Sequence, residues 1–179
     1  MIRLFVGLAL PEPVALAIDR LNDAMPGAHW VEPENLHITL RFIGDIDEGD
    51  AEDVHHELMR VRAPAFQLSL SGIGAFGQGR KTRALWVGVE KNQALGLLQG
   101  RVDAAVVRAG QPHEPRKFVP HVTLARFRSG PADRIQNFIV ANNLFRAGPF
   151  GVGHFVLFES EMGAGGSVYH TLESYPLQP

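Results

Sequence analysis

Short runs in which apolar and polar residues alternate are separated by longer runs in which apolar residues recur at helical spacing. The alternating runs cover residues 3–8, 37–40, 85–89 and 121–124 and are rich in β-branched residues. This pattern predicts strands that bury one face.

Four longer runs have the spacing of amphipathic helices: residues 14–21, 48–60, 94–107 and 133–142. Pro11 and Pro13 stand at the start of the first run, where proline is tolerated. Asn92 is suited to be the N-cap of the third run.

The predicted elements follow the order strand–helix–strand–helix–strand twice. His37 and His121 lie 84 positions apart, and Phe66 and Phe150, in the last strand of each unit, each lie 29 positions past their histidine. Each half alone would be small for a domain, and no Gly/Ser-rich linker separates the halves. We therefore expect residues 1–179 to form one α+β domain, with two lobes around a central cleft.

Composition and charge exclude several classes of protein. The formal net charge is −2, whereas proteins that coat long nucleic acids are usually basic. No run of roughly 20 apolar residues predicts a membrane span, and the start of the chain lacks the apolar core of a signal peptide. The chain has no cysteine, which fits a reducing compartment. We expect a cytoplasmic, monomeric protein that does not contact membranes.

Basic residues cluster at 80–83, 116–117 and 126–128, and two of these clusters flank the second histidine strand. This arrangement favours small phosphate-bearing substrates, or one end of an RNA, over a long duplex. The loop 76–83 is either a basic flap over RNA or a solvated connection.

The most informative motif is His37-Ile38-Thr39-Leu40, repeated as His121-Val122-Thr123-Leu124. Alternation along a strand places each histidine and its threonine on one face. One neutral and one protonated imidazole can act as general base and general acid in a displacement at phosphorus. The threonine hydroxyls can donate to phosphate oxygens on which charge accumulates.

No other motif indicates a metal or a cofactor. His55 and His56 are adjacent on a predicted helix and point to different sides, so they form a poor chelate. The glycines of 72–77 match a dinucleotide-binding spacing by letter, but no evident helix follows them, and we interpret the segment as a turn. We expect neither a metal nor a cofactor.

The motifs and their flanks resemble a known family. Residues 30–44, with Trp30 at their start and Gly44 at their end, closely resemble the first motif of bacterial and archaeal 2′-5′ RNA ligase-like proteins. These are RNA 2′,3′-cyclic phosphodiesterases of the two-histidine phosphoesterase superfamily. Residues 118–126 are similar to the second motif, and both ends of the chain also match.

The resemblance implies a bilobal fold in which two mostly antiparallel sheets face a cleft, with one motif in each lobe. It implies that His37 donates a proton to the leaving 3′ oxygen, that His121 accepts one from water, and that Thr39 and Thr123 hold the phosphate. The product would be a 2′-phosphate end, and the reverse reaction would be ATP-independent 2′-5′ ligation. The residues alone leave the order of donor and acceptor open, because the half-sites are nearly symmetric.

Four further residues could contact the substrate. Regular alternation places Arg126 on the face opposite His121, unless a bulge redirects it. The same alternation places Arg41 on the face of His37 and Thr39. Phe42 and Tyr169 could stack on a base or belong to the core.

Two rival functions remain open at this stage. One is a two-histidine esterase that acts on another cyclic nucleotide phosphate or on 2′-5′ oligoadenylate. The other is a non-catalytic protein that binds RNA ends. Such a protein would be expected to have lost one histidine or threonine of the motifs, whereas both motifs are intact in this sequence.

Overall fold

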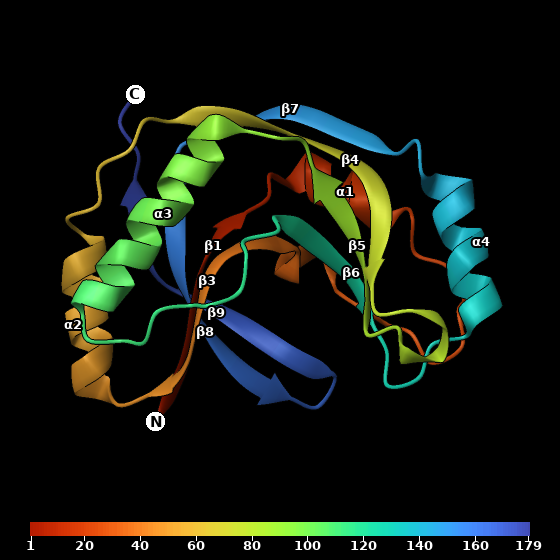
Figure 1. Ribbon diagram of the computed structural model, residues 1–179, viewed down its shortest axis with the longest axis horizontal. Helices are drawn as coiled ribbons and strands as arrows, with labels where there is room; N and C mark the ends of the chain where they lie inside the picture. Colours follow the sequence, from red (N-terminus) through yellow and green to blue (C-terminus); the bar gives the residue numbers. More distant parts are fainter.

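The computed structural model describes residues 1–179, in which nine strands form one curled sheet accompanied by four α-helices (Figure 1). The strands are β1 (Ile2–Ala9), β2 (His29–Trp30), β3 (His37–Ile46), β4 (Phe66–Phe76), β5 (Ala84–Val89), β6 (His121–Arg126), β7 (Arg146–Val152), β8 (His154–Gly163) and β9 (Gly166–Pro176). The helices are α1 (Glu12–Asp19), α2 (Glu48–Leu58), α3 (Gln93–Arg108) and α4 (Ala132–Asn142). The chain also forms two short 3-10 helices, η1 (Pro33–Asn35) and η2 (Gly79–Lys81). The predicted elements are therefore present in the predicted order.

The sheet consists of two curved halves that meet at the histidine strands. The strand order is β7-β4-β5-β6-β3-β1-β8-β9, with β2 beside β6, and neighbouring strands are antiparallel. At the junction, β3 and β6 are paired only through Ile38 and Val122. The predicted bilobal α+β fold is confirmed, and the two expected sheets are the halves of one curled sheet, joined at β3 and β6.

The two lobes do not coincide with the two sequence repeats. Strand β4 comes from the first repeat but pairs with β5 and β7 of the second. Helix α3 comes from the second repeat but packs against α2 and β3, while α1 packs near β7. Figure 1 shows α2 and α3 together on one side of the molecule and α4 on the other. Each lobe therefore contains elements from both repeats.

Helix α3 shows how local sequence sets these elements. The Asn92 side chain accepts a hydrogen bond from the backbone N–H of Leu95 at 2.9 Å, as expected for an N-cap. Leu95, Leu98 and Val102 recur at helical spacing and are fully buried. The apolar face of α3 is thereby fixed against the lobe of β3.

The predicted turn at residues 72–77 is wrong, because β4 continues through Phe76. A bulge between Leu70 and Ile73 accommodates Gly72, whose φ is +77°. Gly74 lies under the ring of Trp86, where a Cβ atom would come within 2.3 Å of the indole. These glycines therefore permit a bend and a close approach inside a strand.

None of the helices is long and apolar enough to cross a membrane.

Candidate active site

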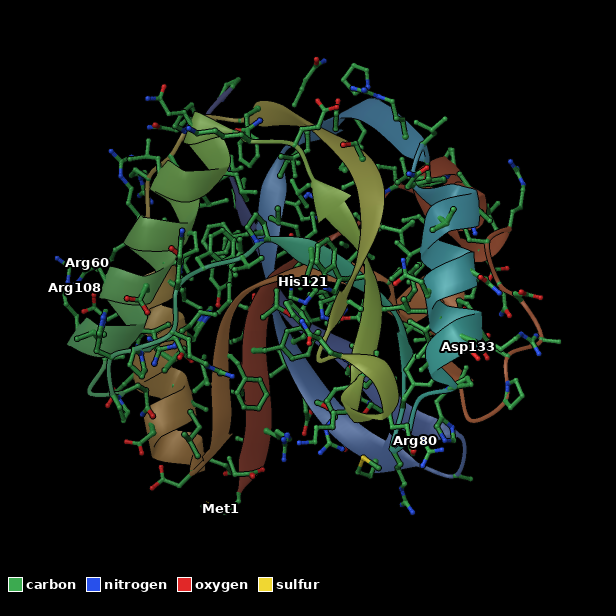
Figure 2. All side chains as sticks on the ribbon, turned by 45° about the vertical axis from the view of Figure 1, so that its right-hand side comes forward. Met1, Arg60, Arg80, Arg108, His121 and Asp133 are labelled. Atoms are coloured by element: carbon green, nitrogen blue, oxygen red, sulfur yellow. The ribbon has the colours of Figure 1, made fainter.

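The junction between the two half-sheets brings the two histidine motifs together. Ile38 and Val122 face each other and are completely buried, so their side chains lie beneath the site, on the core side of the sheet. In this antiparallel register His37 lies towards Thr123, and His121 lies towards Thr39. All four side chains are half-buried on the opposite face. Figure 2 shows His121 near the middle of the molecule, between the lobes.

The two imidazoles are oriented by equivalent backbone contacts. His37 Nδ1 lies 2.7 Å from the carbonyl oxygen of Asn35, and His121 Nδ1 lies 2.7 Å from that of Val119. An Nδ1–H that donates to a carbonyl leaves Nε2 free to exchange a proton. His37 Nε2 lies 3.0 Å from Thr39 Oγ1. In both half-sites Nε2 is therefore the nitrogen that makes no backbone contact.

Burial makes both imidazoles hard to protonate in the unliganded protein. Burial lowers the pKa of His37 to about 4, although the hydrogen bond to the backbone of Asn35 raises it. The positive charges of Arg126 and of protonated His121 lower this pKa further. Burial and the charge of Arg126 also lower the pKa of His121, although the hydrogen bond to the backbone of Val119 raises it. At neutral pH both histidines are therefore neutral before a substrate binds.

Each histidine strand contains a bulge three residues after its histidine. Along β3, Thr39 pairs with Gly7 and Arg41 with Val6, which leaves Leu40 unpaired in that ladder. A β-bulge of this kind adds one residue to a strand and shifts the alternation of side chains beyond it.

The same irregularity occurs in β6. Thr123 pairs with Trp86 and Ala125 with Leu85, which leaves Leu124 as the extra residue. Leu124 and Ala125 are consequently both buried, and Arg126 is exposed. The bulge therefore redirects Arg126 from the face that regular alternation predicts to the face of His121.

The bulge in β3 has the opposite consequence for Arg41. Arg41, which regular alternation places on the face of His37, lines the larger hollow beside Thr39 but is only 6% exposed, and its charge is paired with Asp103. Its guanidinium also donates to the carbonyl oxygens of Pro112 and, at 3.0 Å, Phe42. Arg41 thus forms part of the wall of the site and links β3 to α3.

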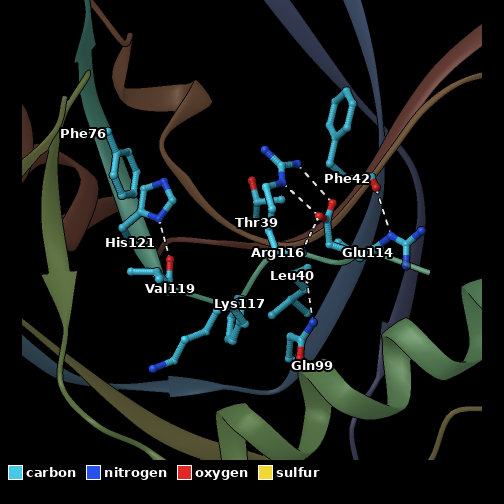
Figure 3. A pocket seen from close by; sticks show the side chains of 12 residues that line it. Thr39, Leu40, Phe42, Phe76, Gln99, Glu114, Arg116, Lys117, Val119 and His121 are labelled. Atoms are coloured by element: carbon cyan, nitrogen blue, oxygen red, sulfur yellow. Dashed lines mark hydrogen bonds and ion pairs between the residues drawn. The ribbon is translucent and has the colours of Figure 1, made fainter. Parts of the chain in front are cut away.

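Two hollows lie on either side of the histidine pair. The larger, of about 400 Å³, contains His121 in its wall and is shown in Figure 3. The smaller, of about 230 Å³, contains His37, Arg126 and Tyr169. Thr39 and Phe42 line both hollows. The cleft is therefore continuous past the two imidazoles.

Aromatic rings surround each imidazole. His37 lies 4.8 Å from the ring of Phe5 and 5.1 Å from that of Tyr169, which meets it edge-on. His121 lies 4.8 Å from the ring of Phe76, also edge-on. Neither Phe5 nor Phe76 is predicted as a site residue by a motif, and the only signal for them in the sequence is the alternation of side chains along β1 and β4.

The loop 76–83 is hydrogen-bonded to the segment that follows β6. The N–H of Phe127 donates to the carbonyl of Arg83 at 2.9 Å, and that of Gly130 donates to Arg80 at 3.3 Å. Thr82 is buried within the loop. In this structure the loop packs beside residues 127–130, and the flap remains a prediction.

The residues of the site do not form a metal-binding set. No three His, Cys, Asp or Glu side chains in the chain lie close enough together to hold a metal ion. His55 bonds instead to the hydroxyl of Tyr175, with 2.8 Å between Nδ1 and the oxygen.

Comparison with known families agrees with this arrangement. Residues 10–164 match the family model of the 2′-5′ RNA ligase superfamily. The chain belongs to this superfamily. The family predicted from the two motifs is confirmed.

Members of the superfamily with curated names are similar over the whole chain. An RNA 2′,3′-cyclic phosphodiesterase from Methanothermobacter thermautotrophicus is 33% identical, over 98% of this chain and 99% of its own length. A protein of the same name from Aquifex aeolicus is 27% identical, over 99% of this chain and 98% of its own length.

A solved structure of the superfamily has the same fold. Escherichia coli LigT in its apo form is 26% identical and has a TM-score of 0.79, covering 99% of this chain and 98% of its own. This similarity supports the bilobal architecture described above.

Proposed function

We propose that the protein hydrolyses RNA 2′,3′-cyclic phosphate ends to 2′-phosphate ends. The observation that carries the proposal is the pair of imidazoles on abutting strands, each held through Nδ1 and each lining the same cleft. The names of the similar superfamily members support this choice of substrate.

The geometry suits acid–base catalysis at a phosphate between the lobes. His121 Nε2 accepts a proton from the attacking water, and His37 Nε2 donates a proton to the leaving 3′ oxygen. Water attacks phosphorus as the bond to the 3′ oxygen breaks, so the phosphate remains on the 2′ oxygen. The hydroxyls of Thr39 and Thr123 and the guanidinium of Arg126 stabilise charge on the non-bridging oxygens.

His37 becomes protonated when the substrate binds. The pKa of His37 is about 4 in the unliganded protein, mainly because of burial. A phosphodiester anion beside the ring favours the charged imidazolium and offsets this effect. Substrate binding and protonation of the donor are therefore coupled.

The acid–base pair and the strained cyclic diester together suffice for this reaction, and we propose that it requires neither a metal nor ATP. The reverse reaction uses the same groups. A 5′-hydroxyl in place of water then yields a 2′-5′ linkage.

The test is incubation with a short RNA that ends in a 2′,3′-cyclic phosphate, followed by mapping of the product phosphate. We expect a 2′-phosphate. A 3′-phosphate would contradict the assigned leaving group, and an unchanged substrate would contradict the function. Nucleoside cyclic phosphates and 2′-5′ oligoadenylate in parallel reactions distinguish the related esterases.

A further inference from the structure

The two hollows beside the histidines form the two ends of one continuous cleft. His121 lines only the larger hollow, and His37 lines only the smaller one. Thr39 and Phe42, which line both, mark the position between them. A phosphate at this position has one compartment on each side.

In a displacement at phosphorus, the entering and leaving oxygens lie on opposite sides of the phosphorus atom. If His37 serves the leaving 3′ oxygen, the ribose that carries the cyclic phosphate occupies the smaller hollow. The entering group then comes from the larger hollow, next to His121. Its volume of about 400 Å³ far exceeds the roughly 30 Å³ that one water occupies.

The walls of the larger hollow are suited to a nucleobase. Phe42 and Phe76 are 40% and 38% exposed, and the neighbouring Val119 is 46% exposed, which is high for apolar side chains of this size. Exposed aromatic rings bind unpaired bases by stacking, without regard to sequence. The ring of Phe76 lies 4.8 Å from the imidazole of His121, and Phe42 lines both hollows at the position of the phosphate.

The rim of this hollow carries one uncompensated positive charge. Arg116 is held by Glu114, with Nε 2.9 Å from one carboxylate oxygen and a terminal nitrogen 3.1 Å from the other (Figure 3). Lys117 also lines the hollow, is exposed, and has no ion-pair partner. A lysine in this situation is suited to a backbone phosphate.

We propose that the hollow lined by His121, Phe42, Phe76 and Lys117 binds the 5′-terminal nucleoside of a second RNA strand. The base stacks on the phenylalanines, and the first internucleotide phosphate contacts Lys117. The O5′ attacks phosphorus and transfers its proton to His121, while the bond to O3′ breaks and O3′ takes the proton of His37. Atoms and charges balance without a nucleotide cofactor. The inference rests on the proposed function and adds the location of the acceptor.

The test measures how water and an RNA acceptor compete for one phosphate. An RNA with a 2′,3′-cyclic phosphate end is incubated with a 5′-hydroxyl dinucleotide, and the ratio of ligated to hydrolysed product is determined. We expect Lys117→Gln to lower this ratio about tenfold. Lys91→Gln, which changes an exposed lysine that does not line the hollow, is the matched control and should leave the ratio unchanged.

A second acceptor isolates the phosphate contact. With a 5′-hydroxyl mononucleoside, which has no internucleotide phosphate, Lys117→Gln should give the wild-type ratio. An equal loss with both acceptors, or no loss with either, would overturn the assignment. Wild-type protein that hydrolyses the RNA end but forms no ligated product at any acceptor concentration would also overturn it. If the wild-type protein consumes no cyclic phosphate at all, the proposed function fails instead.

Discussion

His37 and His121 occupy equivalent positions in the two repeats, but the residues that follow their bulges differ in charge. Five residues after its histidine, the first repeat has Phe42 and the second has Arg126. Both side chains are exposed beyond a bulge, and both line the hollow of His37. The repeat therefore supplies one pair of imidazoles and only one guanidinium. The proposed mechanism, which assigns different steps to the two half-sites, agrees with this asymmetry.

We predict that Arg126→Gln lowers kcat by roughly 10²-fold, because it removes a charged donor from the phosphate. It should also move the bell-shaped pH profile of kcat/KM to higher pH. The positive charge of Arg126 lowers the pKa of both histidines, so its removal raises both. Arg128→Gln, at an exposed neighbouring position, is the control for lost charge. An unchanged profile in Arg126→Gln would show that the guanidinium does not act on the pair.

The threonines give a second prediction at this scale. Thr39→Val and Thr123→Val keep the branched shape but remove the hydroxyl, so each should lower kcat by up to about 10²–10³-fold with little change in melting temperature. Thr171→Val, at an exposed position in β9, is the matched control. Variants that melt normally and turn over at the wild-type rate would show that the hydroxyls do not contact the phosphate.

At the scale of elements, the sequence predicts the strands, the helices and the N-cap at Asn92, because these depend on local spacing. The bulges are harder to predict. Leu124 and Ala125 are consecutive apolar residues, which hints at the shift in β6, whereas Leu40 and Arg41 give no such signal. The burial of Arg41 depends on its partner Asp103 in α3, far away in the sequence. Contacts of this kind are not visible in the pattern of one strand.

The ion pair between Arg41 and Asp103 predicts a marked effect on stability. Asp103→Ala leaves a buried guanidinium without its counter-charge, which should lower the free energy of unfolding by roughly 3 kcal/mol. Glu90→Ala breaks the exposed pair with Arg146 and should cost less than about 1 kcal/mol. Chemical denaturation of both variants makes the comparison. Equal small losses would mean that the buried pair does not hold α3 to β3.

At the scale of the whole molecule, the exchange of elements between lobes explains which strand pairings the repeat predicts and which it does not. The motifs predict that His37, Thr39, His121 and Thr123 meet, because each strand has one polar face. They do not predict that β4 pairs with the second repeat, since an element order does not specify its partners. Phe76 approaches His121 from β4, two strands away in the sheet, and this approach follows from the same pairing. Phe5 approaches His37 from the adjacent strand β1.

The burial of His37 makes the stability of the molecule depend on pH. The pKa of His37 is about 4 in the folded protein, against about 6.5 for an unperturbed histidine, so the unfolded chain binds more protons between these values. The contribution of His37 to the free energy of unfolding, about 3 kcal/mol, is therefore fully present above pH 6.5 and is lost as the pH falls towards 4. His37→Gln should show a smaller loss of melting temperature over this range. Parallel curves for both proteins would contradict the burial of the imidazole.

The most direct test of the two-histidine mechanism is the turnover of an RNA 2′,3′-cyclic phosphate end in excess EDTA, measured for the wild type, His37→Ala, His121→Ala and the double variant. We predict undiminished wild-type turnover, a loss of at least about 10²-fold in each single variant, and a double variant that loses less than the product of the two. A single variant with near-normal turnover, or a wild-type activity that requires a divalent ion, would contradict the account.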